Sequence, residues 1–189
     1  MKERPILFKG PLVRAILAGQ KTVTRRIFKL PHGLWETSPS GDLVPIPTSG
    51  PYGKPGDRLW VRETWARIRV AQAPDQEWVV YRESDNRTDY GGPWKPGIHM
   101  FRRDSRILLE ITAVRIERLQ DITEEQARAE GITDGGCTNC GNNEPCGCDC
   151  PTPSAVDSFY HLWNSINGAG AWEANPWVWV VEFKRVTPP

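Results

Sequence analysis

The segment Pro176-Trp177-Val178-Trp179-Val180-Val181-Glu182-Phe183-Lys184-Arg185-Val186, near the end of the chain, is intensely apolar. Most of its residues are β-branched or aromatic, a composition that is typical of strands. A run without a polar face is expected where a strand is covered on both sides. We therefore predict that residues 176–186 form a central strand that closes a sheet near the C-terminus.

Four other segments have the short length and the side-chain alternation of strands. They are Pro5–Phe8, Asp57–Trp65, Glu77–Tyr81 and Arg106–Leu119. Because many short strands with few helices are typical of small barrels, the pattern predicts a mixed α/β (α+β) fold built on a small β-barrel. The length of 189 residues suits one domain that spans residues 1–189.

Two short helices are predicted beside these strands. The first should stop at Gly19, so that the segment starting at Lys21 follows a helix end directly. Farther along, Thr123 and Gln126 have the spacing of a capping box for a helix that runs to Glu130. Glu130 is therefore expected at a helix terminus.

A third helix is predicted from Ser154, a good N-cap residue, to about Asn167. Its apolar residues form one stripe, which should pack as core and not as an exposed binding face. The stripe consists of Val156, Phe159, Tyr160, Trp163 and Ile166.

Between the first helix and the second strand, the segment 31–55 is rich in proline and glycine. It has five Pro, four Gly and three Ser after Pro31, so we predict a long connection without regular structure.

Charge and hydropathy exclude several classes of protein. Lys and Arg (24) nearly balance Asp and Glu (23), giving a net charge of +1, which does not suit a polybasic surface for membranes or long nucleic acid. Any contact with nucleic acid must be local. No apolar run has the length of a secretory signal or a membrane span, so we expect a cytoplasmic protein that does not enter a membrane.

All five cysteines lie close together, in an insertion at residues 135–152. This spacing differs from that of a disulfide-stapled secreted domain and favours metal binding in a reducing compartment. The first two have the spacing of a zinc knuckle, and four thiolates would satisfy a closed, structural zinc site. The predicted ligands are Cys137, Cys140, Cys146 and Cys148, with Cys150 as a spare or a replacement. A metal-free loop is the alternative.

The segment Ile16-Leu17-Ala18-Gly19-Gln20-Lys21-Thr22-Val23-Thr24-Arg25-Arg26 resembles the opening motif of the ASCH family, relatives of the PUA RNA-binding barrel. Three further segments agree with that family in their order along the chain. They are Tyr52–Leu59, Ile122–Ile132 and Trp179–Phe183. The resemblance implies a PUA-like barrel with flanking helices.

Some small bacterial members of this family are amidohydrolases that act on N(4)-acetylcytidine. The resemblance places their Lys, Thr and Glu trio on Lys21, Thr24 and Glu130. In its length and in the segment Trp60–Trp65, the chain is more similar to larger, phage-associated ASCH proteins, for which no settled activity is implied. The implied partner is thus a modified cytosine nucleoside or base, or RNA; no obligate protein partner is inferred.

These three residue types suit amide cleavage. A threonine hydroxyl is a weak nucleophile and needs a base, and a buried lysine with a lowered pKa can serve. Thr24 would be the nucleophile, Lys21 the base and Glu130 the proton donor for the leaving nitrogen, with no cofactor needed for catalysis. Burial would lower the pKa of Lys21 whereas a nearby carboxylate would raise it. The ordinary alternatives are a lysine that caps a helix end, a strand threonine and a solvated glutamate.

Four more residues are candidates for substrate binding. Arg26, or Arg25 if the strand has the opposite phase, would bind an oxygen of the base or a phosphate. Glu63 is a second carboxylate, and Trp60 and Trp65 would form a wall of a base pocket. A salt bridge for Glu63 and core packing for the tryptophans are the alternatives. We therefore expect an amidohydrolase for N(4)-acylated cytosine nucleosides; an RNA-binding or modified-base-reading module and a ribonuclease are the alternatives.

Overall fold

The computed structural model describes residues 1–29, 35–37, 39, 41, 43–45, 50–70, 73–83, 93–132 and 154–186. Its helices are α1 (Gly10–Leu17), α2 (Glu124–Ala129) and α3 (Ala155–Asn167). Its strands are β1 (Glu3–Leu7), β2 (Val23–Ile27), β3 (Trp35–Thr37), β4 (Leu43–Pro45), β5 (Arg58–Arg62), β6 (Trp65–Val70), β7 (Ala73–Tyr81), β8 (Leu108–Arg118) and β9 (Trp177–Val186). Among these residues, no helix combines the length and apolarity needed to cross a membrane.

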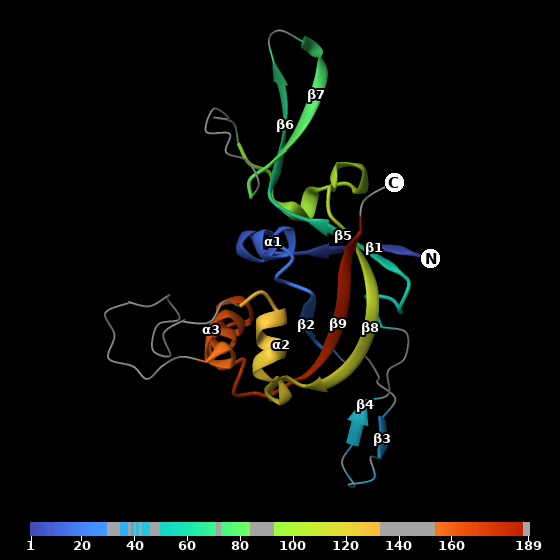
Figure 1. Ribbon diagram of the computed structural model, residues 1–189, viewed down its shortest axis with the longest axis vertical. Helices are drawn as coiled ribbons and strands as arrows, with labels where there is room; N and C mark the ends of the chain where they lie inside the picture. Colours follow the sequence, from blue (N-terminus) through green and yellow to red (C-terminus); the bar gives the residue numbers. More distant parts are fainter. Residues whose placement is uncertain are drawn as a thin grey trace, which may run out of the picture.

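A five-stranded sheet forms the centre of the molecule, with the order β1-β5-β8-β9-β2. β1 runs parallel to β5, and the other neighbours are antiparallel. β9 is hydrogen-bonded on both sides, which confirms the prediction of a central C-terminal strand. Two separate antiparallel pairs, β3–β4 and β6–β7, extend from opposite ends of this sheet (Figure 1).

Side chains that alternate along β9 enter two different parts of the core. Val181 and Phe183 pack in the cluster that includes Val13 and Ile16 of α1. On the other face, Val180 packs in the cluster that α2 and α3 cover. Figure 1 shows α2 and α3 beside β2, at the same edge of the sheet. Helices on both faces explain why this strand lacks a polar side.

Local signals in the sequence explain where the helices begin. The Thr123 side chain accepts a hydrogen bond from Gln126 N, and the Gln126 side chain accepts one from Thr123 N. Ser154 and Asp157 make the same reciprocal pair at the start of α3. Both predicted caps are therefore confirmed, and Glu130 is the C-cap residue of α2.

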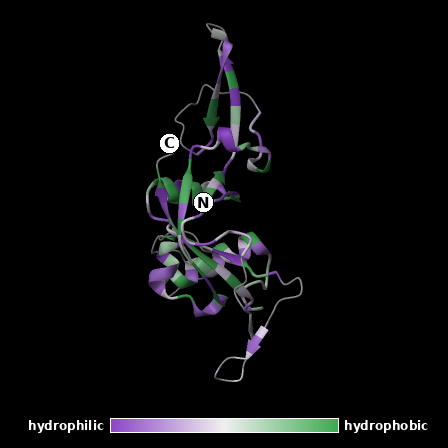
Figure 2. Ribbon diagram, turned by 90° about the vertical axis from the view of Figure 1, so that its right-hand side faces the viewer, coloured by the Kyte–Doolittle hydropathy of each residue, from purple (hydrophilic) through white to green (hydrophobic). Residues whose placement is uncertain are grey.

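The structure departs from the predictions in three places. The segment 31–55 is not wholly irregular, because β3 and β4 pair within it. The predicted strand Asp57–Trp65 is divided between β5 and the start of β6. The hairpin β6–β7 projects from the body, and hydrophilic and hydrophobic residues alternate along it (Figure 2). The mixed α/β class is confirmed, but β1 and β2 end the strand order, and the described residues show no pairing that closes a barrel.

Candidate functional site

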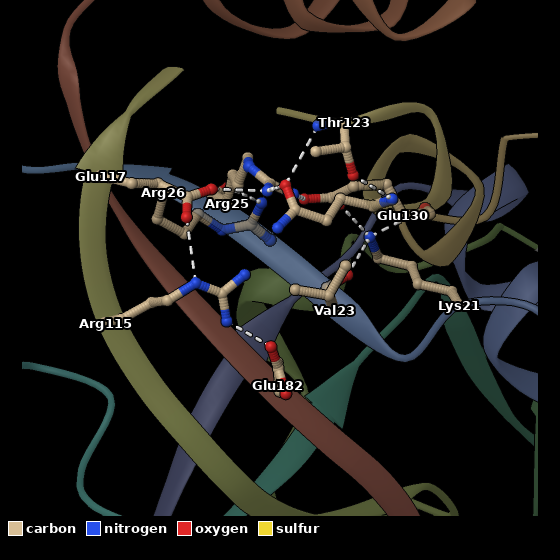
Figure 3. Close-up of polar contacts among 10 residues, drawn as sticks. Lys21, Val23, Arg25, Arg26, Arg115, Glu117, Thr123, Glu130 and Glu182 are labelled. Atoms are coloured by element: carbon tan, nitrogen blue, oxygen red, sulfur yellow. Dashed lines mark hydrogen bonds and ion pairs between the residues drawn. The ribbon is translucent and has the colours of Figure 1, made fainter. Parts of the chain in front are cut away.

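Lys21 and Glu130, which are far apart in the sequence, are in direct contact. The Lys21 Nζ lies 2.5 Å from Glu130 Oε2, 2.9 Å from the Glu130 carbonyl oxygen and 2.7 Å from the Val23 carbonyl oxygen (Figure 3). Both side chains are buried, with 0% and 4% of their surfaces exposed. The contact is therefore a buried ion pair that carries additional hydrogen bonds.

Backbone hydrogen bonds hold the two segments together. Thr22 N donates to the Ala129 carbonyl at 2.8 Å, and Lys21 pairs with Glu130 as an isolated antiparallel bridge. Gly131 follows with a positive φ of 87°, a conformation that favours glycine. A Cβ at this glycine would lie 2.7 Å from the Ala15 Cβ and 3.1 Å from the Lys21 Cβ. The glycine thus allows α1, Lys21 and the end of α2 to approach closely.

Replacing Gly131 by alanine is expected to lower the free energy of unfolding by about 2–4 kcal/mol, since backbone strain and steric overlap add. Gly19→Ala is a matched control, because Gly19 also has a positive φ, 74°, but nothing lies within 4 Å of its Cβ position. That variant should lose only about 1 kcal/mol. Urea denaturation measures both values; equal losses would show that the close approach to Lys21 is unimportant.

The hydrogen bonds of Lys21 match the protonated amine. Three oxygen atoms accept from its Nζ, and an ammonium group has three protons to donate. Burial nevertheless lowers the pKa of the Lys21 amine, and the Glu130 carboxylate opposes that change without cancelling it. Of the two opposing effects expected from the sequence, burial is thus the larger. A lowered pKa makes the neutral amine more accessible than it is for an exposed lysine.

Arg25 connects this pair to a longer network. Its guanidinium lies 3.3 Å from Glu130 Oε1, 2.6 Å from Glu117 Oε1 and 2.8 Å from Gln126 Oε1. The ion pairs continue to the surface in the order Lys21, Glu130, Arg25, Glu117, Arg115 and Glu182. Figure 3 shows Glu130 between Lys21 and Arg25. Glu130 is therefore oriented through both of its carboxylate oxygens.

A cleft of about 480 Å³ lies beside this network. Its polar wall contains Arg25, Arg26 and Glu130, and its apolar walls come from the start of α1 and from α3. The α3 side chains in the wall are Phe159, Leu162, Trp163, Ile166 and Asn167. The predicted apolar stripe of α3 is thus more than core, since part of it faces a cavity. Amphipathic periodicity alone does not separate these two roles.

Thr24 and Arg26 lie on the other face of β2 from Arg25, because side chains alternate along a strand. The Arg26 guanidinium donates to the Leu7 carbonyl at 2.9 Å and lies 5.1 Å from the centre of the Phe8 ring, over which the Lys21 Nζ also lies. Thr24 is only 1% exposed, and its hydroxyl has no hydrogen-bond partner in the described structure. Neither Thr24 nor Lys21 lines the cleft, whereas Glu130 does.

The other predicted binding residues lie outside the cleft. Glu63 is buried and makes a bidentate ion pair with Arg106, at 2.8 and 2.9 Å. Trp60 is buried, with the Arg62 guanidinium 4.7 Å from its ring centre. Trp65 lines a second pocket at the base of the β6–β7 hairpin. The structure brings together Lys21, Glu130, Arg25 and Arg26. Glu63, Trp60 and Trp65 lie apart from that group.

Nothing among the described residues tests the predicted zinc site. The four cysteine ligands, and Cys150, fall within 133–153, outside the part of the chain that the structure describes. In the described part, no group of three or more His, Cys, Asp or Glu residues is placed to hold a metal ion.

Comparison of the chain with protein-family models, with curated proteins and with solved structures gave no match.

Proposed function

We propose that the chain is an amidohydrolase that removes the acyl group from N(4)-acylated cytosine nucleosides, and that it is a PUA-like member of the ASCH family. The observation that carries this proposal is the buried Lys21–Glu130 contact at the wall of a cleft. A buried ion pair adds little to stability because desolvation offsets its attraction. A buried lysine whose pKa is lowered, in contact with a carboxylate that lines a cavity, is more typical of a functional site.

The cleft suits a nucleoside in size and chemistry. Its volume of about 480 Å³ falls within the range of small-molecule sites. Aromatic and aliphatic side chains of α3 offer an apolar wall to a planar base, while the two arginines offer donors to its oxygen atoms. Arg26 retains N–H groups beyond those that bind backbone carbonyls, so it is the proposed donor to the oxyanion.

In the proposed first half-reaction, the proton of the Lys21 ammonium moves to Glu130 across their 2.5 Å contact. The Thr24 hydroxyl then attacks the acyl carbonyl carbon and gives its proton to the neutral Lys21 amine. As the C–N bond breaks, Glu130 donates its proton to the exocyclic nitrogen, and cytidine leaves. Because Thr24 is buried, the substrate must displace a covering side chain, which we take to be Arg26 on the same strand face.

The second half-reaction repeats these proton transfers with water. Lys21 again passes a proton to Glu130 and accepts one from the water molecule that attacks the acyl-threonine ester. Glu130 returns its proton to the Thr24 oxygen as that oxygen leaves. The carboxylic acid is released, and the ammonium and carboxylate of the resting pair are restored, so that amide and water give amine and acid in balance.

Incubation of the purified protein with N(4)-acetylcytidine tests this proposal, with cytidine release followed by chromatography. Glu130→Gln keeps the shape of the side chain but cannot donate the proton, and we expect it to lower turnover by about 10²–10⁴-fold. Glu125→Gln, an exposed position on the same helix, should leave turnover within about twofold. A wild-type protein without turnover that binds nucleoside or RNA would overturn the proposal in favour of a reader module.

A further inference from the structure

A second pocket, of about 440 Å³, lies where the β6–β7 hairpin leaves the body. Its wall includes the cationic side chains of Arg62, Arg67 and Lys95, together with Trp65. The guanidinium of Arg67 and the Nζ of Lys95 lie 5.6 and 5.4 Å from the centre of the Trp65 ring. Two cations thus face the Trp65 ring, and a third, Arg62, lines the same pocket while its guanidinium lies over the Trp60 ring. They gather here in a chain whose net charge is only +1.

Buried N–H groups without acceptors are concentrated in this wall. The Nε of Arg62, the Nε1 of Trp65 and the Nε of Arg67 are buried, and none has a hydrogen-bond partner in the described structure. Trp65 as a whole is only 2% exposed. A buried N–H group without an acceptor lowers the stability of the folded protein. Three such groups around one cavity therefore indicate that a ligand supplies the acceptor.

The charges of the pocket are only partly balanced. One terminal nitrogen of Arg67, Nη2, lies 2.8 Å from both carboxylate oxygens of the buried Asp104, and Nη1 lies 3.5 Å from Glu77 Oε2. Within the described part of the chain, Arg62 and Lys95 make no ion pair. The pocket therefore has donors and positive charge in excess, which is the environment that an anion requires.

This second pocket adjoins the cleft. Ile98 lines both cavities, and Gly97 before it lines the cleft. A Cβ at Gly97 would lie 3.0 Å from the Glu63 carbonyl oxygen, so the turn between the cavities packs closely on the end of β5. Phe101, which is 61% exposed, also lines the second pocket. The two cavities are separated by a single turn of the chain.

We propose that the second pocket binds a phosphate group of a nucleotide whose cytosine base occupies the cleft. The inference rests on the proposed function, because the base in the cleft makes phosphate the natural anion beside it. Guanidinium groups bind phosphate through paired N–H donors, and the Trp65 and Lys95 groups add donors from other directions. The preferred substrate is therefore a nucleotide and not the free nucleoside. The phosphate belongs either to a mononucleotide or to the backbone of an RNA strand.

Calorimetric titration with cytidine, cytidine 5′-monophosphate, cytidine 3′-monophosphate and a cytidine-containing RNA trinucleotide tests this inference. We expect a phosphate-bearing ligand to bind the wild-type protein at least about tenfold more tightly than cytidine. Arg62→Gln and the exposed Lys95→Gln should each remove most of this difference without changing the affinity for cytidine. Arg69→Gln, on the same hairpin but outside the pocket, should retain it.

The arms of the experiment separate the outcomes. A gain with either monophosphate assigns the pocket to a mononucleotide, whereas a gain with the trinucleotide alone assigns it to a strand backbone. Equal affinity for all ligands, absence of binding, or a difference that persists in both pocket variants would overturn the inference. If phosphate-dependent binding is lost in those variants but neither N(4)-acetylcytidine nor its monophosphates are hydrolysed by the wild-type protein, the pocket stands and the proposed function fails.

Discussion

Replacing Glu130 by leucine is expected to lower the free energy of unfolding by about 3–5 kcal/mol. The loss arises because Glu130 is the carboxylate that contacts both Lys21 and Arg25, and all three side chains are buried. Without it, the Lys21 ammonium keeps only two backbone carbonyls as acceptors, although its charge remains in the interior. Denaturant unfolding at neutral pH, followed by tryptophan fluorescence, measures the change.

The double variant Lys21→Met/Glu130→Leu should recover most of this loss. It removes both members of the pair and replaces them with apolar groups of similar volume, while Arg25 retains Glu117 and Gln126. Both variants should be inactive towards N(4)-acetylcytidine. A double variant that is as unstable as Glu130→Leu would show that the cost does not come from an unpaired Lys21 charge.

Replacing Thr24 by valine is expected to lower turnover by about 10³-fold, because the isosteric valine lacks the proposed nucleophile. Thr22→Val is a matched control on the same segment, since Thr22 is exposed. It should leave turnover within about twofold. The measurement is cytidine release at saturating substrate, together with trapping of an acyl-enzyme in the wild-type protein by mass spectrometry.

The free energy of unfolding of Thr24→Val shows whether a loss of turnover comes from catalysis or from a damaged structure. Its hydroxyl is buried without a hydrogen-bond partner, so valine removes an unsatisfied polar group and leaves no orphan behind. Thr24→Val should therefore be as stable as the wild-type protein, or more stable. Unchanged turnover in a stable Thr24→Val variant would exclude the nucleophile role, even if Lys21 and Glu130 prove essential.

Features encoded by neighbouring residues could be predicted from the sequence. The two capping boxes need only residues three positions apart, so Thr123 and Ser154 were recognisable as helix starts. The central position of β9 followed from its lack of a polar face. The β3–β4 pair was missed, because prolines and glycines dominate the segment around two strands of only three residues each.

The site itself depends on contacts that no local pattern contains. The pairing of Lys21 with Glu130 was expected only from a family resemblance, since each residue alone has an ordinary surface role. The contacts of Arg25 with Glu117 and Gln126 join β2, β8 and α2, and sequence spacing gives no sign of them. The buried pairing of Glu63 with Arg106 is the alternative that the sequence left open, and the sequence alone could not identify Arg106 as the partner. In each case the partner is far away in the sequence, so only the folded structure identifies it.

The short helix α2 bears on two parts of the site at once. At one end it carries Glu130; at the other, the Glu124 carboxylate accepts hydrogen bonds from Ala155 N and Val156 N, at 2.9 and 3.2 Å, and so fastens the start of α3. Since α3 forms the apolar wall of the cleft, α2, a helix of fewer than two turns, links that wall to the Glu130 contact with Lys21. A ligand that displaces α3 is therefore expected to move Glu130 relative to Lys21, which would couple occupancy of the cleft to the geometry of this buried ion pair.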